Sequence, residues 1–201
     1  MDESRILGRP KSEGYWEKRY REGGKSGQGS VGQARDWKWS VIDKHVSPVE
    51  DVVDIGCGDL SFWEGRTCER YFGVDISPLI IKRNTEKRPA WAFVSWPAEK
   101  RLPFRGRVVL CLDVLFHILD DKTATRIIEN LCEYSNEWVI VHSWWRNPLG
   151  EKLNDGVYQA FRPLDKTLFS RLGFDLVEEA PAPQEVNPYG AMYVFRKKAQ
   201  G

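Results

Sequence analysis

The order of apolar and polar positions predicts a chain in which buried strands alternate with helices. Short apolar runs rich in β-branched residues are typical of buried strands, and they occur near residues 50–55, 70–75, 91–95, 107–112 and 136–142. Segments with helical spacing or capping signals predict helices near residues 12–21, 35–46, 60–65, 78–87, 122–133 and 164–171. Because this alternation gives a parallel sheet with helices on both faces, we expect a doubly wound α/β fold.

The C-terminal part predicts a different kind of connection. Two further strands, near residues 174–178 and 192–196, are separated by a Pro-rich turn and not by a helix. We therefore expect them to form an antiparallel pair at one edge of a mostly parallel, seven-stranded sheet. At 201 residues, the chain is long enough for one domain with a full core.

The first 34 residues differ in composition from the rest. A short amphipathic helix over residues 12–21 is followed by residues 22–32, which are rich in Gly and Ser. Composition alone fits a flexible linker, and the functional alternative is a mobile lid that closes over a cofactor or substrate. We divide the chain into an N-terminal helix with a Gly/Ser-rich candidate lid, residues 1–34, and a main domain, residues 35–201.

The most informative motif is a glycine-containing turn at the end of the first buried strand. Gly56 and Gly58 follow the run Val-Val-Asp-Ile, and Asp75 ends the next predicted strand about 20 residues later. The glycines allow a sharp turn and a close approach of a ligand to the main chain. An acidic residue at this distance is placed to bind the two hydroxyl groups of a ribose. The pattern predicts a nucleoside site.

The same loop argues against a dinucleotide. Ser61 stands where the dinucleotide fingerprint has its third glycine, and the carboxylates of Asp54 and Asp59 would repel a pyrophosphate. Both carboxylates suit a ligand that carries an ammonium group. A dehydrogenase is therefore disfavoured, and no phosphate-binding loop with the spacing G-x-x-x-x-G-K-[ST] is present.

Four segments together resemble the class I S-adenosylmethionine-dependent methyltransferases. They are residues 54–58, 73–77, 102–104 and 112–117, in the order and spacing of that family, and the resemblance covers roughly residues 35–198. It implies a Rossmann-like seven-stranded fold, S-adenosyl-L-methionine as cofactor and S-adenosyl-L-homocysteine as product. In many members the segment before the first strand covers the cofactor, which favours the lid.

The resemblance also implies which residues contact the cofactor. The glycine loop would hold the methionine part, Asp75 the ribose, and the end of the fourth strand the methionine side. The adenine contact departs from the family pattern, because Ala98 stands where an acidic or amide residue is common; Trp96 by stacking, or Glu99, would replace it. The expected cofactor residues are Tyr20, Asp54, Ile55, Gly56, Cys57, Gly58, Asp75, Ile76, Ser77, Trp96, Ala98, Glu99, Leu112, Asp113 and Val114.

Two of the three histidines are candidate general bases for an acceptor hydroxyl. His142 ends the fifth predicted strand, where ligands of open α/β sheets bind. His117 follows the fourth strand, where a histidine recurs in family members with different substrates, which favours a structural or loop-anchoring role over catalysis. The expected substrate residues follow the fifth strand and are Trp144, Trp145, Arg146, Tyr158 and Arg162, with the alternative that both Trp side chains only cover the sheet.

Charge, cysteine content and the length of apolar runs bear on the binding partner, the compartment and the presence of a zinc site. The formal net charge is +1, so no broad basic field points to nucleic acid. The basic cluster of Lys100, Arg101, Arg105 and Arg107 fits a solvated face or, less often, an acidic substrate. Four cysteines without C-x-x-C spacing predict reduced thiols, hence a cytoplasmic protein, and no zinc site. No apolar run is long enough to cross a membrane.

We therefore expect a methyltransferase that acts on oxygen or nitrogen of a small-molecule or saccharide acceptor. Methylation of a protein or an RNA is the alternative, although the fourth strand lacks the N- or D-P-P-[YF]-like motif of many nucleic-acid amino methyltransferases. A non-catalytic cofactor-binding subunit of a larger methyltransferase is a second alternative, against which the intact glycine loop and Asp75 count. The acceptor and the oligomeric state are not determined by the sequence.

Overall fold

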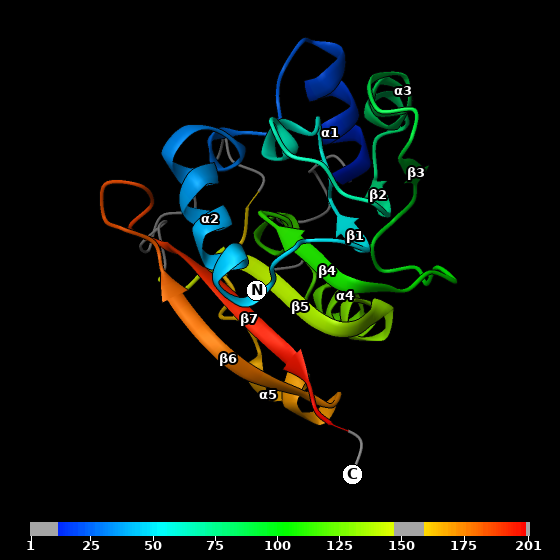
Figure 1. The fold of residues 1–201 in the computed structure, drawn as a ribbon. Coiled ribbons are helices and arrows are strands. Elements are labelled where there is room, and N and C mark those ends of the chain that lie inside the picture. Colours follow the sequence, from blue (N-terminus) through cyan, green and yellow to red (C-terminus); the bar gives the residue numbers. More distant parts are fainter. Residues whose placement is uncertain (1–11, 147–158, 200–201) are drawn as a thin grey trace.

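A computed structural model describes residues 12–146 and 159–199. Its centre is a seven-stranded sheet with the strand order β3-β2-β1-β4-β5-β7-β6 (Figure 1). The first five strands run parallel, and β7 lies antiparallel between β5 and β6. The expected sheet, with its antiparallel C-terminal pair at one edge, is thus confirmed.

The strands are β1 (Val52–Ile55), β2 (Tyr71–Asp75), β3 (Ala92–Ser95), β4 (Gly106–Leu112), β5 (Ser135–Trp144), β6 (Phe174–Pro181) and β7 (Gly190–Lys197). The helices are α1 (Ser12–Arg21), α2 (Gly32–His45), α3 (Pro78–Lys87), α4 (Asp121–Tyr134) and α5 (Lys166–Arg171). Short 3-10 turns lie within the candidate lid at η2 (Gln28–Ser30), after β1 at η3 (Ser61–Trp63) and after β4 at η4 (Leu115–His117).

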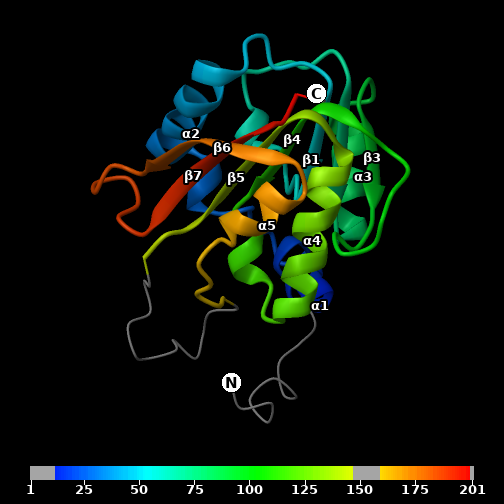
Figure 2. The same ribbon diagram turned by 90° about the horizontal axis from the view of Figure 1, so that it is seen from below.

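Alternate residues of the central strands supply two hydrophobic layers, one on each face of the sheet. In β1, Val53 and Ile55 pack with α4 and α5, whereas Val52 packs with α2 on the other face. Figure 2 shows α2 and α4 on opposite sides of the strands. Helices therefore cover both faces, and the strand ends between these layers are left for a site.

The connection from β1 to β2 is not the helix that we expected near residues 60–65. Leu60 has a left-handed backbone (φ 63°), and only the short turn η3 follows it. The buried ring of Trp63 packs edge-on against Trp39, Tyr71 and Trp91, with ring centroids 5.0 to 5.6 Å away. An aromatic cluster thus covers this face in place of a helix.

Helix α1 docks on α3 and so brings the N-terminal region to the sheet (Figure 1). The Glu17 carboxylate accepts hydrogen bonds from the Ser77 hydroxyl and the Leu79 amide at the start of α3. Arg83 of α3 donates to the carbonyl of Tyr20 at 3.1 Å. Within the described residues, no helix combines the length and apolarity needed to cross a bilayer.

Candidate functional site

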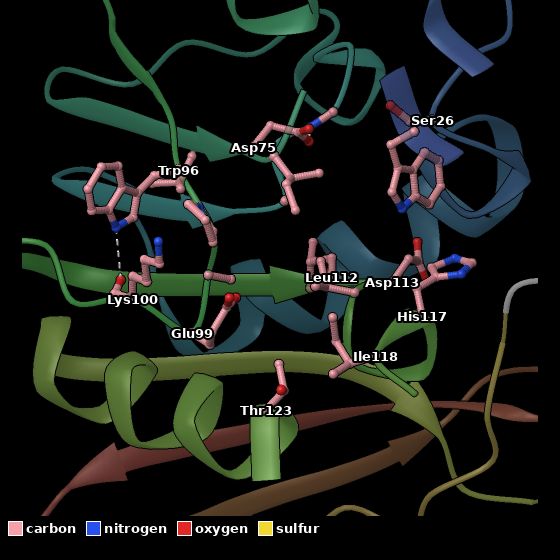
Figure 3. Close-up of a pocket in the computed structure, with 18 of the residues that line it drawn as sticks. Ser26, Asp75, Trp96, Glu99, Lys100, Leu112, Asp113, His117, Ile118 and Thr123 are labelled. Atoms are coloured by element: carbon pink, nitrogen blue, oxygen red, sulfur yellow. Dashed lines mark hydrogen bonds between the residues drawn. The ribbon is translucent and has the colours of Figure 1, made fainter. Parts of the chain in front are cut away.

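A cavity of about 560 Å³ lies at the carboxyl ends of the parallel strands, within the usual size range of small-molecule sites. Figure 3 shows Trp96 and Lys100 at one end, Ser26, Asp113 and His117 at the other, and Asp75 between these ends. The lining residues are Trp16, Tyr20, Ser26, Ser30, Gly56, Gly58, Val74, Asp75, Ile76, Trp96, Pro97, Ala98, Glu99, Lys100, Leu112, Asp113, Val114, His117, Ile118, Leu119, Asp120 and Thr123. Most of the residues expected at the cofactor are therefore among the lining residues.

Glycine is required at both positions of the turn after β1. Gly56 and Gly58 have φ values of 78° and 54°, which side chains with a Cβ atom rarely adopt. A Cβ atom on Gly56 would overlap Val114, and one on Gly58 would overlap the hydroxyl of Ser26. Both glycines line the cavity, and the close packing of Val114 and Ser26 on them leaves no room for a side chain at either position.

Asp75 ends β2 at the wall of the cavity, and its carboxylate is largely buried. The backbone amides of Gly58 and Ser77 each donate to it at 3.0 Å. Burial raises the pKa of Asp75 to about 6, although the two amide hydrogen bonds act in the opposite direction. A carboxylate held in this way can accept hydrogen bonds from the two hydroxyl groups of a ribose.

The side chain of Asp54 points away from the cavity. Its carboxylate accepts hydrogen bonds from Trp63 at 2.7 Å and from Tyr71 at 2.8 Å, inside the aromatic cluster. Burial raises the pKa of Asp54 to about 6 as well. Of the expected cofactor residues, Asp54, Ile55, Cys57 and Ser77 do not line the cavity, whereas the others do.

The end of the cavity beyond β3 contains the three residues expected at the adenine. Trp96, Ala98 and Glu99 all line it, and the indole of Trp96 donates to the carbonyl of Lys100 at 3.1 Å (Figure 3). Asn130 of α4 donates to the carbonyl of Ala98 at 2.8 Å and so fixes this loop. The arrangement provides an aromatic ring, a small residue and a carboxylate around one end of the cavity.

The N-terminal segment forms a wall that the sequence located only in part. Tyr20 was expected there, whereas Trp16, Ser26 and Ser30 were not singled out. The Ser26 hydroxyl donates to the Asp59 carboxylate at 2.9 Å and accepts from the Asp59 amide at 2.8 Å. The sequence signal for Ser26 and Ser30 was the prediction that the Gly/Ser-rich residues 22–32 form a lid.

The two candidate bases occupy different positions. His117 lines the cavity, and its ring meets that of Trp16 edge-on, with centroids 5.0 Å apart. His142 is buried, with 2% of its surface exposed, and is not part of the lining. Its Nδ1 atom contacts the Asp113 carboxylate, and its Nε2 atom has no hydrogen-bond partner among the described residues.

Of the residues expected at the substrate, the four that the structure describes do not line this cavity either. Trp144 is buried and stacks on Phe116 at 4.7 Å, and Trp145 packs on the core below the guanidinium group of Arg146. Arg162 donates to the carbonyl of Ile118 at 2.9 Å and thereby supports a loop that does line the cavity. Tyr158 lies outside the described residues.

Most of the basic cluster is neutralised by neighbouring carboxylates. Arg101 and Arg105 pair with Glu133, and Arg107 pairs with Glu137. Lys100 alone of the four lines the cavity. The cluster is therefore mainly a surface ion-pair network and not a patch of free positive charge.

Comparison with solved structures shows the same fold in several methyltransferases. Magnesium protoporphyrin IX methyltransferase (ChlM) from Synechocystis PCC 6803, with bound SAH, superposes with a TM-score of 0.68 at 18% identity, covering 93% of this chain and 95% of that chain. The N-methyltransferase NodS from Bradyrhizobium japonicum WM9, with bound SAH, has a TM-score of 0.64 at 17% identity, covering 83% and 88%. The chain therefore has the class I methyltransferase fold.

Sequence comparison is informative over a shorter stretch. No known family model matches the chain. A tRNA U34 carboxymethyltransferase of Shewanella sp. (strain ANA-3) is 39% identical over 51 residues, which are 23% of this chain and 16% of the relative. The match thus spans about a sixth of the length of that relative, and it does not extend over a whole domain.

Proposed function

We propose that the protein is an S-adenosylmethionine-dependent methyltransferase that modifies oxygen or nitrogen of a small-molecule or saccharide acceptor. The observation that carries this proposal is the meeting of Gly56, Gly58 and Asp75 in one cavity at the strand ends. A methyl group on a positively charged sulfur is the chemistry that the cofactor would supply there. Fold similarity to methyltransferases supports the proposal by analogy.

The cavity residues fit this cofactor in its parts. The turn at Gly56 and Gly58 would hold the methionine part, because both residues line the cavity at the end of β1. Asp75 would accept the ribose hydroxyls, and Trp96 and Ala98 would enclose the adenine. Methyl transfer needs alignment and exclusion of water more than covalent help.

Among the histidines, His117 is the better candidate for the base. It lines the cavity, whereas the free ring nitrogen of His142 is buried against Gly190. A general base must reach the proton that it removes, either directly or through one water molecule. We propose that His117 receives the proton if the acceptor is a hydroxyl, and that Trp16 beside it helps to exclude water.

A macromolecular acceptor is the second candidate, since the matched segment of the Shewanella protein belongs to an enzyme named for a tRNA. The near-neutral charge and the paired arginines favour a small acceptor. We also propose a cytoplasmic location, because the four cysteines are all free and buried.

Calorimetric titration of the purified chain with S-adenosylmethionine, and separately with NAD, tests the cofactor. We expect binding in the micromolar range for the first and none for the second. Transfer of a labelled methyl group to panels of sugars, small amines and phenols, against tRNA and protein, then tests the acceptor class. Binding of NAD alone would refute the proposal, and labelling of only tRNA or protein would replace its acceptor.

A further inference from the structure

A buried cluster of three ionisable side chains lies directly behind the cavity wall. Lys38 comes from α2, Asp113 follows β4, and His142 belongs to β5. The Lys38 ammonium group donates to one Asp113 oxygen, and the His142 Nδ1 atom contacts the other. Only 1% of the Lys38 side chain is exposed, which is rare for lysine. Three elements far apart in sequence thus meet at one carboxylate.

The charges in this cluster are balanced. Burial alone would raise the pKa of Asp113, but Lys38 and His142 outweigh it and hold this pKa well below its usual range. Burial, followed by the nearby Lys38 charge, lowers the pKa of His142. Asp113 is therefore ionised and His142 neutral at pH 7, so Nδ1 of His142 carries the hydrogen donated to Asp113. One cation and one anion remain: the ammonium group is buried, and the carboxylate is partly exposed and lines the cavity.

Lys38 also reaches the candidate lid. Its ammonium group donates to the carbonyl of Gly29 at 3.0 Å. A Cβ atom on Gly29 would overlap both the Asp113 carboxylate and the Lys38 ammonium group, so the lid main chain packs directly on the ion pair. Ser26 and Ser30, on either side of Gly29, line the cavity.

A buried ion pair of this kind is poor evidence for added stability, because removing the charges from water costs about as much as their attraction returns. Its clearer effect is to specify one arrangement, since a buried ammonium group tolerates few alternative partners. Here the fixed arrangement includes Asp113, which has a left-handed backbone (φ 62°) and lines the cavity.

We propose that Lys38 is a positioning residue that holds residues 26–30 of the candidate lid closed over the methionine end of the cofactor site. It does so by joining the Gly29 carbonyl to Asp113, while His142 orients Asp113 from behind. This inference rests on the proposed function, because it assigns the closed segment to cofactor binding. Lys38 itself does not touch the cavity.

Two variants test the contact between Lys38 and Gly29, one on each side of it. Lys38→Met removes the ammonium group. Gly29→Ala keeps both charged side chains in the chain but adds a methyl group that clashes with them, so the lid main chain must move away. Lys44→Met is the matched control, because Lys44 lies on the same helix but is exposed and pairs with Glu178. The readouts are amide hydrogen exchange of residues 22–31 without cofactor, and the Kd of S-adenosylmethionine by calorimetry.

We expect both variants to speed exchange in residues 22–31 and to raise the Kd about tenfold, the size of one charge-assisted hydrogen bond. The control should match the wild type in both measurements. Wild-type exchange and affinity in Gly29→Ala would overturn the inference even if Lys38→Met fails to fold. If the wild-type chain binds no S-adenosylmethionine, the proposed function fails, whereas the exchange measurement still tests the Lys38 contact by itself.

Discussion

Asp75 offers the sharpest test of where the ribose binds. Replacing it with Asn keeps the shape of the side chain and removes its charge. A charge-assisted hydrogen bond contributes about 1.5–3 kcal/mol, so Asp75→Asn should raise the Kd of S-adenosylmethionine by about 10- to 150-fold. The buried position of Asp75 places the effect toward the upper end of this range. Calorimetric titration at pH 7.5 measures it.

The pH dependence adds a second, independent signature. The pKa of Asp75 is raised to about 6 by burial, and the ribose hydroxyls need the ionised form. Affinity should therefore be constant above pH 7 and fall by up to about tenfold per pH unit below pH 6. Asp75→Asn should bind weakly at every pH and show no such fall.

Protonation of Asp75 does not itself destabilise the fold over this range. A carboxyl whose folded pKa is raised binds its proton more tightly in the folded state, so its contribution to stability is complete below its ordinary pKa and is lost as the pH rises through 6. Asp54→Asn is the matched control, because the pKa of Asp54 is also about 6 but its side chain faces the aromatic cluster. We expect that variant to retain the pH dependence. Equal affinity of Asp75→Asn and wild type would refute the ribose assignment.

Three further predictions concern other parts of the molecule. Trp63→Ala should lower the free energy of unfolding by about 3–5 kcal/mol, because it removes a fully buried ring and a donor to Asp54. Urea denaturation measures this change, and a loss below about 1 kcal/mol would contradict a stabilising role of the aromatic cluster. Ser26→Ala should weaken cofactor binding several-fold in a titration, since it removes the hydrogen bonds between the Ser26 hydroxyl and Asp59. The melting temperature should stay near that of the wild type, and an unchanged Kd would count against a lid that contributes to binding. His117→Ala should reduce kcat on a hydroxyl acceptor by about 10²-fold or more with little change in cofactor Kd, and wild-type turnover in that variant would exclude His117 as the base.

Some features of the molecule were predictable because they depend on local sequence. Strand patterning, the left-handed glycines at 56 and 58, and an acidic residue after the second strand are each specified by residues close together in the chain. Alternating strands and helices leave few possible topologies, because parallel connections have one preferred hand. The mostly parallel sheet, its antiparallel edge pair and a site at the strand ends were predicted from these rules.

Other features depended on which side chains meet. The apolar run after Gly58 looked like a helix, but the left-handed Leu60 and the packing of Trp63 with Trp39 and Trp91 end it after a short turn. Tertiary packing here overrides local preference. The side chain of Asp54 is a second example. Successive side chains of a strand point to opposite faces, and Asp54 points into the aromatic cluster, where Trp63 and Tyr71 donate to it, and not into the cavity.

The sheet, the glycine loop and the position of Asp75 can be predicted from the chain, since backbone conformation and strand ends depend on nearby residues. The environment of each charged group depends instead on tertiary contacts. Lys38 stands between two Trp residues on a helix, and nothing in that pattern distinguishes it from a solvated lysine. Its burial, its pairing with Asp113 and its contact with Gly29 arise because α2, β4, β5 and the lid converge. The energetics of a charge depend on this three-dimensional surrounding and not on its neighbours in the chain.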